Sequence, residues 1–198
     1  MSDSAVEAIR AGRPVILPTD TVYGLCADGY RAAPTRRLYA LKQRPEATPI
    51  ALLAADLDTM LDAIPELRGR AAVLARSLLP GPYTLVLPNP ARRYQWLCGT
   101  TPEKIGVRVP SLPAAGRAVL DRVGVVAATS ANLHGGPDPA SLDEVPEELR
   151  QAVGACVDAG RLPGTPSTVI DLTGRRPFIV REGAVAGADA LARLAAVA

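Results

Sequence analysis

The sequence predicts an α/β domain built on a mixed sheet, and two observations support this prediction. Short apolar segments alternate with segments of helical periodicity along the 198 residues, which is the pattern of strands connected by helices. Some successive strand segments are joined by loops that contain no helix, so we expect a mixed sheet and not a purely parallel one. A chain of this length is expected to form a single domain over residues 1–198.

The expected elements follow one another in regular alternation. Helices are expected over residues 4–12, 34–42, 56–63, 66–79, 113–122, 143–154 and 186–197. Strands are expected over residues 14–18, 49–54, 83–87, 105–109, 124–129, 167–172 and 178–181. The apolar residues of the segment 105–109 alternate, so Arg108 is expected to project from the opposite, polar face of its strand.

The composition excludes several classes of protein. Hydrophobic residues make up 48% of the chain and charged residues 21%, which suits a folded globular protein. The formal net charge of +2 does not indicate a protein coated by nucleic acid, although it does not exclude a local basic patch. No segment approaches the roughly 18 consecutive apolar residues of a membrane span, and the N-terminus has no apolar signal core. We therefore expect a cytoplasmic protein with no membrane partner.

Cysteine and histidine usage narrows the chemistry further. Cys26, Cys98 and Cys156 lie far apart and form no CxxC pair, which argues against a zinc ribbon or a disulfide framework. His134 is the single histidine, so a multi-histidine metal site is excluded and no protein-ligated metal centre is expected. The chain contains no GxSxG elbow, so a serine hydrolase is not indicated.

Polar and cationic side chains cluster where the expected elements end, which is where ligands bind in α/β sheets. The clusters are Thr19–Thr21, Lys42–Arg44, Thr129–Asn132 and Gly164–Thr168, with Arg108 and Arg181 as further cations. Arginine, lysine, hydroxyl and backbone N–H groups are typical partners of phosphates and carboxylates. Each segment by itself is also typical of a helix cap, a turn or a solvated helix end. Together they indicate an anionic ligand and do not identify it.

Seven motifs, taken in order, resemble the YrdC-like family of threonylcarbamoyl-AMP synthases. The motifs are PTDTVYGL (18–25), KQRP with a later Pro-Ile (42–50), PGPYTLVL (80–87), IGVRVP (105–110), TSAN (129–132), PSTVIDLT (166–173) and VREGAV (180–185). Each motif is short, but their order is specific, and they span residues 18–185. Because the sequence ends soon after the last motif, it resembles the short single-domain form, and no additional C-terminal domain is expected.

The resemblance implies a twisted α/β sheet flanked by helices, with a concave, basic ligand-binding face. It implies an enzyme, a nucleotidyltransferase that joins ATP, L-threonine and bicarbonate, with Mg²⁺, into threonylcarbamoyl-AMP and pyrophosphate. A partner transferase system would then place the threonylcarbamoyl group on adenosine 37 of tRNA. The carbamate of threonine must attack the α-phosphorus of ATP, and both are anions. Catalysis should therefore consist largely of charge neutralisation and positioning.

The resemblance also implies roles for particular side chains. The family's KxR…SxN set, implied to carry catalysis and to bind ATP, corresponds to Lys42, Arg44, Ser130 and Asn132. Further ATP contacts are implied at Thr48, Ser167 and Arg181. The threonine site is implied to contain Thr21, Tyr23 and Arg108. Of these, Arg108 is suited to hold the threonine carboxylate.

Two positions depart from the family pattern. Leu53 stands where many synthases carry a histidine that borders the threonine site, and Lys104 stands where a threonine is common. A lysine before IGVRVP also resembles the YciO-type paralogues. The alternative function is therefore a non-synthase paralogue that binds nucleotide and double-stranded RNA or tRNA, since such RNA is recognised largely by shape and phosphate contacts.

Overall fold

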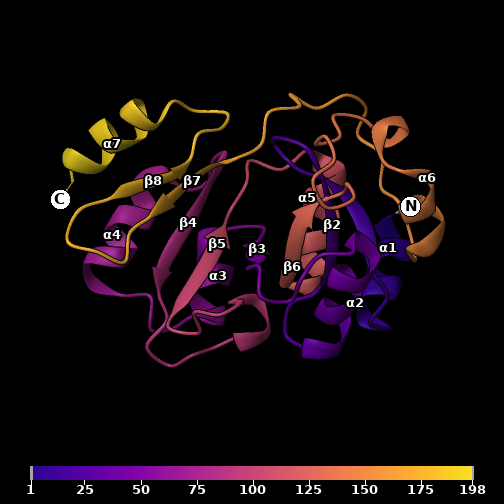
Figure 1. The fold of residues 1–198 in the computed structure, drawn as a ribbon, viewed down its shortest axis with the longest axis horizontal. Helices are drawn as coiled ribbons and strands as arrows, with labels where there is room; N and C mark the ends of the chain where they lie inside the picture. Colours follow the sequence, from indigo (N-terminus) through magenta and orange to yellow (C-terminus); the bar gives the residue numbers. More distant parts are fainter. Residues whose placement is uncertain (1, 198) are drawn as a thin grey trace.

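An eight-stranded mixed sheet forms the centre of the computed structural model, which describes residues 2–197 (Figure 1). The strands are β1 (Val15–Pro18), β2 (Tyr23–Asp28), β3 (Ala51–Ala54), β4 (Tyr83–Pro88), β5 (Lys104–Arg108), β6 (Val125–Ser130), β7 (Thr168–Asp171) and β8 (Phe178–Arg181). Their order across the sheet is β1-β2-β6-β3-β5-β4-β7-β8. The pairs β3–β5 and β4–β7 are parallel and the other neighbours are antiparallel, so the predicted mixed sheet is confirmed.

The helices correspond to the predicted ones with small shifts at their ends. They are α1 (Ser2–Arg10), α2 (Ala32–Lys42), α3 (Leu57–Ala63), α4 (Gly69–Leu78), α5 (Ala114–Val123), α6 (Glu147–Ala152) and α7 (Gly187–Ala195). Residues 143–154, predicted as one helix, form the end of a 3₁₀ turn, η2 (Leu142–Glu144), and then the short α6. Pro146 separates them at the N-cap of α6, because its ring favours a helix start over a helix interior. Among the described helices, none is long and apolar enough to cross a membrane.

Strand β2 was not predicted from the sequence, although it is a central strand. It pairs with β1 on one side, where Val15 lies opposite Cys26, and with β6 on the other, where Gly24 lies opposite Ser130. Residues 23–27 are all buried. A strand buried on both faces lacks the alternation of polar and apolar residues by which a half-exposed strand is recognised.

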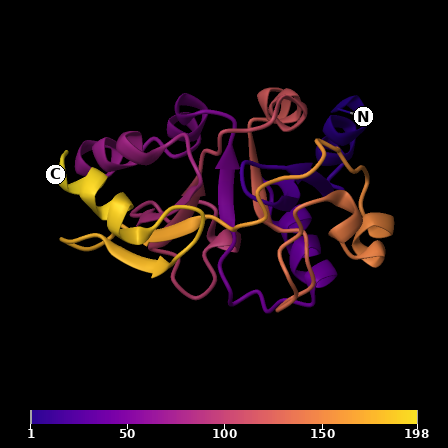
Figure 2. The same cartoon turned by 90° about the horizontal axis from the view of Figure 1, so that it is seen from above.

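The two faces of the sheet carry different cores. Buried residues of α2, α3, α4 and α7 pack in one core with strand residues such as Leu52 and Ala127. Buried residues of α1 and α5 pack in a second core with the next residues along those strands, Leu53 and Ala128. Successive side chains of a strand point to opposite faces, so the two cores lie on opposite sides of the sheet. Figure 2 shows α1 and α5 side by side at one end of the molecule and α7 at the other.

Candidate functional site

A cavity of about 290 Å³ opens on the face of the sheet that α1 and α5 cover in part. Leu53 and Ala128 belong both to the core beneath these helices and to the cavity wall. The charged side chains that line the cavity are Arg44, Lys104, Arg108, Asp138 and Arg181. This excess of cations makes the cavity suitable for an anionic ligand.

Small residues on neighbouring strands leave room for the cavity. Gly24 on β2, Ala51 on β3, Gly106 on β5 and Ala128 on β6 all line it. Their strands are adjacent, in the order β2-β6-β3-β5, and the Cα of Ala51 lies 3.7 Å from where a side chain on Gly106 would begin. Because these positions carry no bulky side chain, a ligand can approach the backbone of the sheet.

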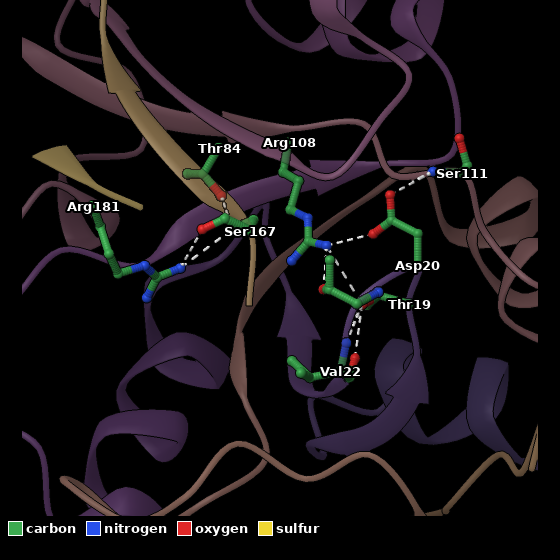
Figure 3. A network of polar contacts seen from close by, with 9 residues as sticks. Thr19, Asp20, Val22, Thr84, Arg108, Ser111, Ser167 and Arg181 are labelled. Atoms are coloured by element: carbon green, nitrogen blue, oxygen red, sulfur yellow. Dashed lines mark hydrogen bonds and ion pairs between the residues drawn. The ribbon is translucent and has the colours of Figure 1, made fainter. Parts of the chain in front are cut away.

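Arg108 is held against one wall of the cavity by a preformed polar network (Figure 3). Its Nη2 donates to Asp20 Oδ1 over 2.5 Å and to Thr21 Oγ1 over 2.6 Å. Its Nε is buried and has no hydrogen-bond partner within residues 2–197. Burial lowers the pKa of Arg108 from its ordinary value, and the neighbouring Asp20 opposes that effect. The prediction that Arg108 projects from the face opposite the apolar residues of its strand is confirmed. The Nε–H of its guanidinium is a hydrogen-bond donor without a partner in a buried setting.

The turn between β1 and β2 supplies the partners of Arg108. Thr19 Oγ1 donates to the carbonyl of Val22 over 2.7 Å, which closes the turn, and Asp20 Oδ2 accepts from the backbone N–H of Ser111 over 3.0 Å. Thr21 is fully buried and is not among the described residues that line the cavity. The structure therefore brings Thr21 to the site, but behind Arg108, where it orients the guanidinium.

Tyr23 requires a correction. Its hydroxyl lies 2.9 Å from Asp158 Oδ1 and 2.7 Å from the carbonyl oxygen of Gly160, and it accepts from the N–H of Ala159 over 3.0 Å. The side chain is fully buried in the core with α2, on the face opposite the cavity. Side chains alternate along β2, so Gly24 faces the cavity and Tyr23 cannot. The expectation that Tyr23 lines the same pocket as Arg108 is therefore wrong.

Lys42 ends helix α2 with its ammonium group enclosed by oxygen atoms. Its Nζ lies 2.5 Å from the carbonyl oxygen of Ser130, 2.5 Å from that of Asn132 and 2.6 Å from Asn132 Oδ1. The residue is 1% exposed and is not among the described residues that line the cavity. Burial, with a smaller effect of Arg44, lowers the pKa of Lys42 to about 8. All three N–H donors are used within the protein, so Lys42 fixes the loop that follows β6.

Arg44, two residues later, turns towards the cavity. Gln43 between them adopts the left-handed conformation, with φ of 51°, and its N–H caps the end of α2. Arg44 lines the cavity, and its Nη2 donates to the carbonyl of Pro49 over 2.8 Å. Its Nε is buried with no partner in the described part of the chain, and burial lowers its pKa. The KQR motif thus combines a buried, structural lysine with an arginine that faces the cavity.

The polar residues at the end of β6 also differ in whether they line the cavity. Ser130 lines the cavity and donates its Oγ–H to Asn132 Oδ1 over 2.6 Å. Asn132 is 7% exposed, and its Nδ2 donates to the carbonyl of Gly136 over 2.5 Å. Among the residues described, neither Asn132 nor Thr48 lines the cavity; the carbonyl of Thr48 accepts from the hydroxyl of Tyr39 over 3.1 Å. Asn132 therefore holds the loop, and Ser130 lies in the cavity wall with its hydroxyl hydrogen donated to Asn132.

The wall opposite Arg108 is formed by Ser167 and Arg181, as Figure 3 shows. Arg181 Nη2 donates to the carbonyl of Ser167 over 2.8 Å, and Ser167 Oγ lies 2.8 Å from Thr84 Oγ1. All of these residues line the cavity. Thr84 was missed by the sequence analysis, although the alternation of polar and apolar residues in strand 83–87 could have found it.

The two departures from the family pattern both lie in the cavity wall. Leu53 presents an aliphatic side chain there, and it is 2% exposed. Lys104 forms an ion pair with Asp171, with Nζ 2.9 Å from Oδ2. Asp138 also lines the cavity and was not predicted. It lies in a loop rich in glycine and proline, where the sequence pattern does not show which side chains point inwards.

Comparison with known proteins finds relatives that match most of the chain. The pattern of the Sua5/YciO/YrdC family, described as "Telomere recombination", matches residues 7–183. A relative from Mycobacterium tuberculosis, which carries the threonylcarbamoyl-AMP synthase name provisionally, is 34% identical over 92% of this chain and 83% of its own length. The threonylcarbamoyl-AMP synthase of Pyrococcus abyssi is 34% identical over 88% of this chain, and the match spans 52% of the archaeal protein.

Solved structures show the same likeness. A double variant of P. abyssi Sua5 has a TM-score of 0.86 at 31% identity, over 95% of this chain and 58% of that one. P. abyssi Sua5 complexed with L-threonine has a TM-score of 0.80 at 33% identity, over 92% of this chain and 54% of that one. Escherichia coli YciO has a TM-score of 0.81 at 29% identity, over 96% of this chain and 92% of YciO. This chain spans just over half the length of the P. abyssi protein, and nearly all of YciO. The chain belongs to the Sua5/YciO/YrdC family.

Proposed function

We propose that the chain is an L-threonylcarbamoyladenylate synthase, a nucleotidyltransferase that makes threonylcarbamoyl-AMP and pyrophosphate from ATP, L-threonine and bicarbonate. One observation carries the proposal: the cavity holds Arg108 on one wall and Arg44 and Arg181 on the others. Two anionic groups can therefore be bound in one site, a carboxylate on one side and a triphosphate on the other. The threonylcarbamoyl-AMP synthase of P. abyssi, with its L-threonine complex, supports this choice of ligands.

The reaction places like charges next to each other. The amino nitrogen of threonine bonds to the carbon of bicarbonate, water leaves, and a carbamate forms. A carbamate oxygen then attacks the α-phosphorus of ATP, and the bond to the pyrophosphate leaving group breaks. Cationic side chains in a desolvated site lower the repulsion between the carbamate and the triphosphate, and they offset the charge that grows on the leaving group.

Each side chain has a place in this scheme. Arg108, held by Asp20 and Thr21, binds the threonine carboxylate through its remaining N–H groups. Arg44 and Arg181 line the cavity and bind the phosphates, with the hydroxyl of Ser167 as a further donor. Ser130 lies beside them in the cavity wall, with its own O–H donated to Asn132. Lys42 and Asn132 act as positioning residues, because their polar atoms are bonded to the loop after β6.

Mg²⁺ fits this site as a cation carried by ATP. Within residues 2–197 there is no group of three or more His, Cys, Asp or Glu side chains that could hold a metal ion. Mg²⁺ is commonly bound by substrate phosphates with one or two carboxylates, and such a set needs no cage of protein ligands. When bound, Mg²⁺ would offset part of the triphosphate charge. Asp138 and the hydroxyls of the cavity wall are the oxygen groups that the protein offers.

The product is a reactive mixed anhydride, so a second enzyme must consume it. We propose that a transferase system moves the threonylcarbamoyl group to adenosine 37 of tRNA in the cytoplasm. Direct contact of this chain with tRNA is a further part of the proposal. The support for both is the likeness to the named synthases.

A second function is favoured by two observations. The chain matches E. coli YciO over 92% of the length of that protein, and Leu53 gives the cavity an aliphatic wall. In this alternative, the cavity binds nucleotide without synthesis, and the protein binds double-stranded RNA or tRNA. RNA affinity would then fall steeply with salt, because phosphate contacts release counterions.

A pyrophosphate-release assay separates the two functions. Purified protein is incubated with ATP, Mg²⁺ and bicarbonate, with and without L-threonine, and the adenylate is detected by mass. A synthase gives pyrophosphate that depends on both threonine and bicarbonate, together with the mass of threonylcarbamoyl-AMP. ATP binding without threonine-dependent turnover would refute the synthase proposal and favour the paralogue.

A further inference from the structure

Asp138 carries the single carboxylate among the described residues that line the cavity. It lies in the loop after β6, is partly buried, and makes no hydrogen bond or ion pair within residues 2–197. Its electrostatic neighbour is Lys42, the buried lysine that also interacts with Arg44. The carboxylate therefore belongs to the end of the cavity where Arg44 would meet phosphates.

The other carboxylates near the cavity are already neutralised. Asp20 pairs with Arg108 and accepts from the N–H of Ser111. Asp171 pairs with Lys104 and accepts from the N–H and hydroxyl of Thr173. Lys42 cannot do the same for Asp138, because its three donors are on Ser130 and Asn132 oxygens. Asp138 thus lines the cavity with no ion-pair partner among the described residues.

A carboxylate without an ion-pair partner opposes the binding of a triphosphate unless a cation lies between them. A divalent cation held by the phosphates would convert this repulsion into attraction, and one carboxylate beside substrate phosphates is a common protein contribution to Mg²⁺ binding. We propose that Asp138 is the protein's contact to the divalent cation that accompanies ATP, an inference that rests on the proposed function. Asp138 then selects Mg·ATP over free ATP, while Arg44 and Arg181 bind either form.

The test measures how much Mg²⁺ strengthens ATP binding. Dissociation constants are determined by calorimetry for the full chain in EDTA and in saturating Mg²⁺, with wild type, Asp138→Asn and Asp143→Asn. Asp143 is an exposed residue of η2 and is not among the described residues that line the cavity. Its variant therefore controls for the loss of one negative charge. Asparagine is nearly isosteric with aspartate, and an unchanged thermal midpoint confirms that the fold is retained.

We expect Asp138→Asn to bind free ATP severalfold more tightly than wild type, because the repulsion is gone. The gain in affinity on adding Mg²⁺ should fall about tenfold, which corresponds to losing one charge-assisted contact. Mg·tripolyphosphate, which has no ribose, should show the same loss, and the affinity of the ternary complex for Mn²⁺, followed by electron paramagnetic resonance, should fall in parallel. Asp143→Asn should behave as wild type in each measurement.

Other results overturn the inference. If Asp138→Asn shifts ATP affinity equally with and without Mg²⁺, the carboxylate does not contact the cation. If the variant weakens both ATP and adenosine but leaves tripolyphosphate unchanged, Asp138 binds the ribose. If wild type binds no ATP under either condition, the proposed function fails and this inference fails with it. If wild type binds Mg·ATP, and Asp138→Asn does not reduce the gain in ATP affinity on adding Mg²⁺, this inference is refuted while the proposed function stands.

Discussion

Arg108 Nη2 and Asp20 Oδ1 lie 2.5 Å apart and join strand β5 to the turn between β1 and β2, across 88 residues of sequence. Both side chains are about nine-tenths buried. A buried ion pair needs further hydrogen bonds to offset its desolvation, and Thr21 and the backbone of Ser111 supply them. The guanidinium is therefore fixed before any ligand arrives, and its buried Nε has no hydrogen-bond partner among the described residues.

Replacing Arg108 should impair threonine binding more than ATP binding. A hydrogen bond to a charged group contributes roughly 1.5–3 kcal/mol, so Arg108→Ala should raise the KM for threonine by about 10- to 100-fold. Arg108→Lys should recover only part of this, because an ammonium lacks the planar fork of guanidinium. Steady-state kinetics of pyrophosphate release, with each substrate varied in turn, gives both KM values.

Arg108→Ala also leaves Asp20 without its cation, so the thermal midpoint must be followed for the same variants. Removing Asp20 as well, in Arg108→Ala with Asp20→Asn, should restore stability and leave threonine use impaired. An equal rise in the KM values of ATP and threonine would show that Arg108 is purely structural.

The sequence was sufficient for the layers of the fold and for the set of segments that meet at the site. It was insufficient where the outcome depends on which face a residue occupies. Tyr23 and Gly24 are neighbours in one motif, and the assignment of Tyr23 to the cavity failed because β2 was not recognised as a strand. In the sequence, Lys42 and Arg44 are both cations at the end of a predicted helix. Their different roles follow from the left-handed Gln43 and from long-range contacts with residues 130–132, which no local pattern contains.

The titration of Lys42 should make the stability of the protein depend on pH. Its pKa is lowered to about 8 from an ordinary value of 10.5, so the unfolded chain holds more protons between these pH values. The contribution of Lys42 to the free energy of unfolding therefore rises with pH across this window and is smallest below pH 8. Urea unfolding of wild type and Lys42→Met at pH 7 and pH 9.5 should show the deficit of the variant growing by about 2 kcal/mol.

Lys42→Met should also be less stable than wild type at pH 7, by about 3 kcal/mol, because the oxygens of Ser130 and Asn132 lose their donor. ATP affinity should fall as well, since Ser130 is no longer held in place. A deficit that stays constant between the two pH values would mean that Lys42 keeps its ordinary pKa in the folded protein.

Gln43→Gly should stabilise the protein. Gln43 is exposed and has a φ of 51°, a left-handed conformation at the end of α2 that glycine adopts without steric cost. The expected gain is about 0.5–1 kcal/mol in the free energy of unfolding, with activity unchanged. Gln43→Ala is the matched control and should give no gain, because alanine keeps the β-carbon. Both are compared by urea unfolding, and a destabilised glycine variant would contradict the role assigned to this position.

Leu53→His should change threonine use and leave ATP use unaltered. Leu53 lines the cavity on β3, paired in register with Arg108 on β5, so an imidazole at this position would lie beside the proposed carboxylate site. We expect the KM for threonine to shift severalfold, on the order of one hydrogen bond gained, while the KM for ATP stays within about twofold. The leucine is 2% exposed, so the polar ring should also lower stability.

Leu53→Met, which conserves volume and adds no hydrogen-bond donor, is the control and should keep both KM values. If Leu53→His folds and neither KM moves, the threonine side chain and carboxylate are bound elsewhere in the cavity, away from β3.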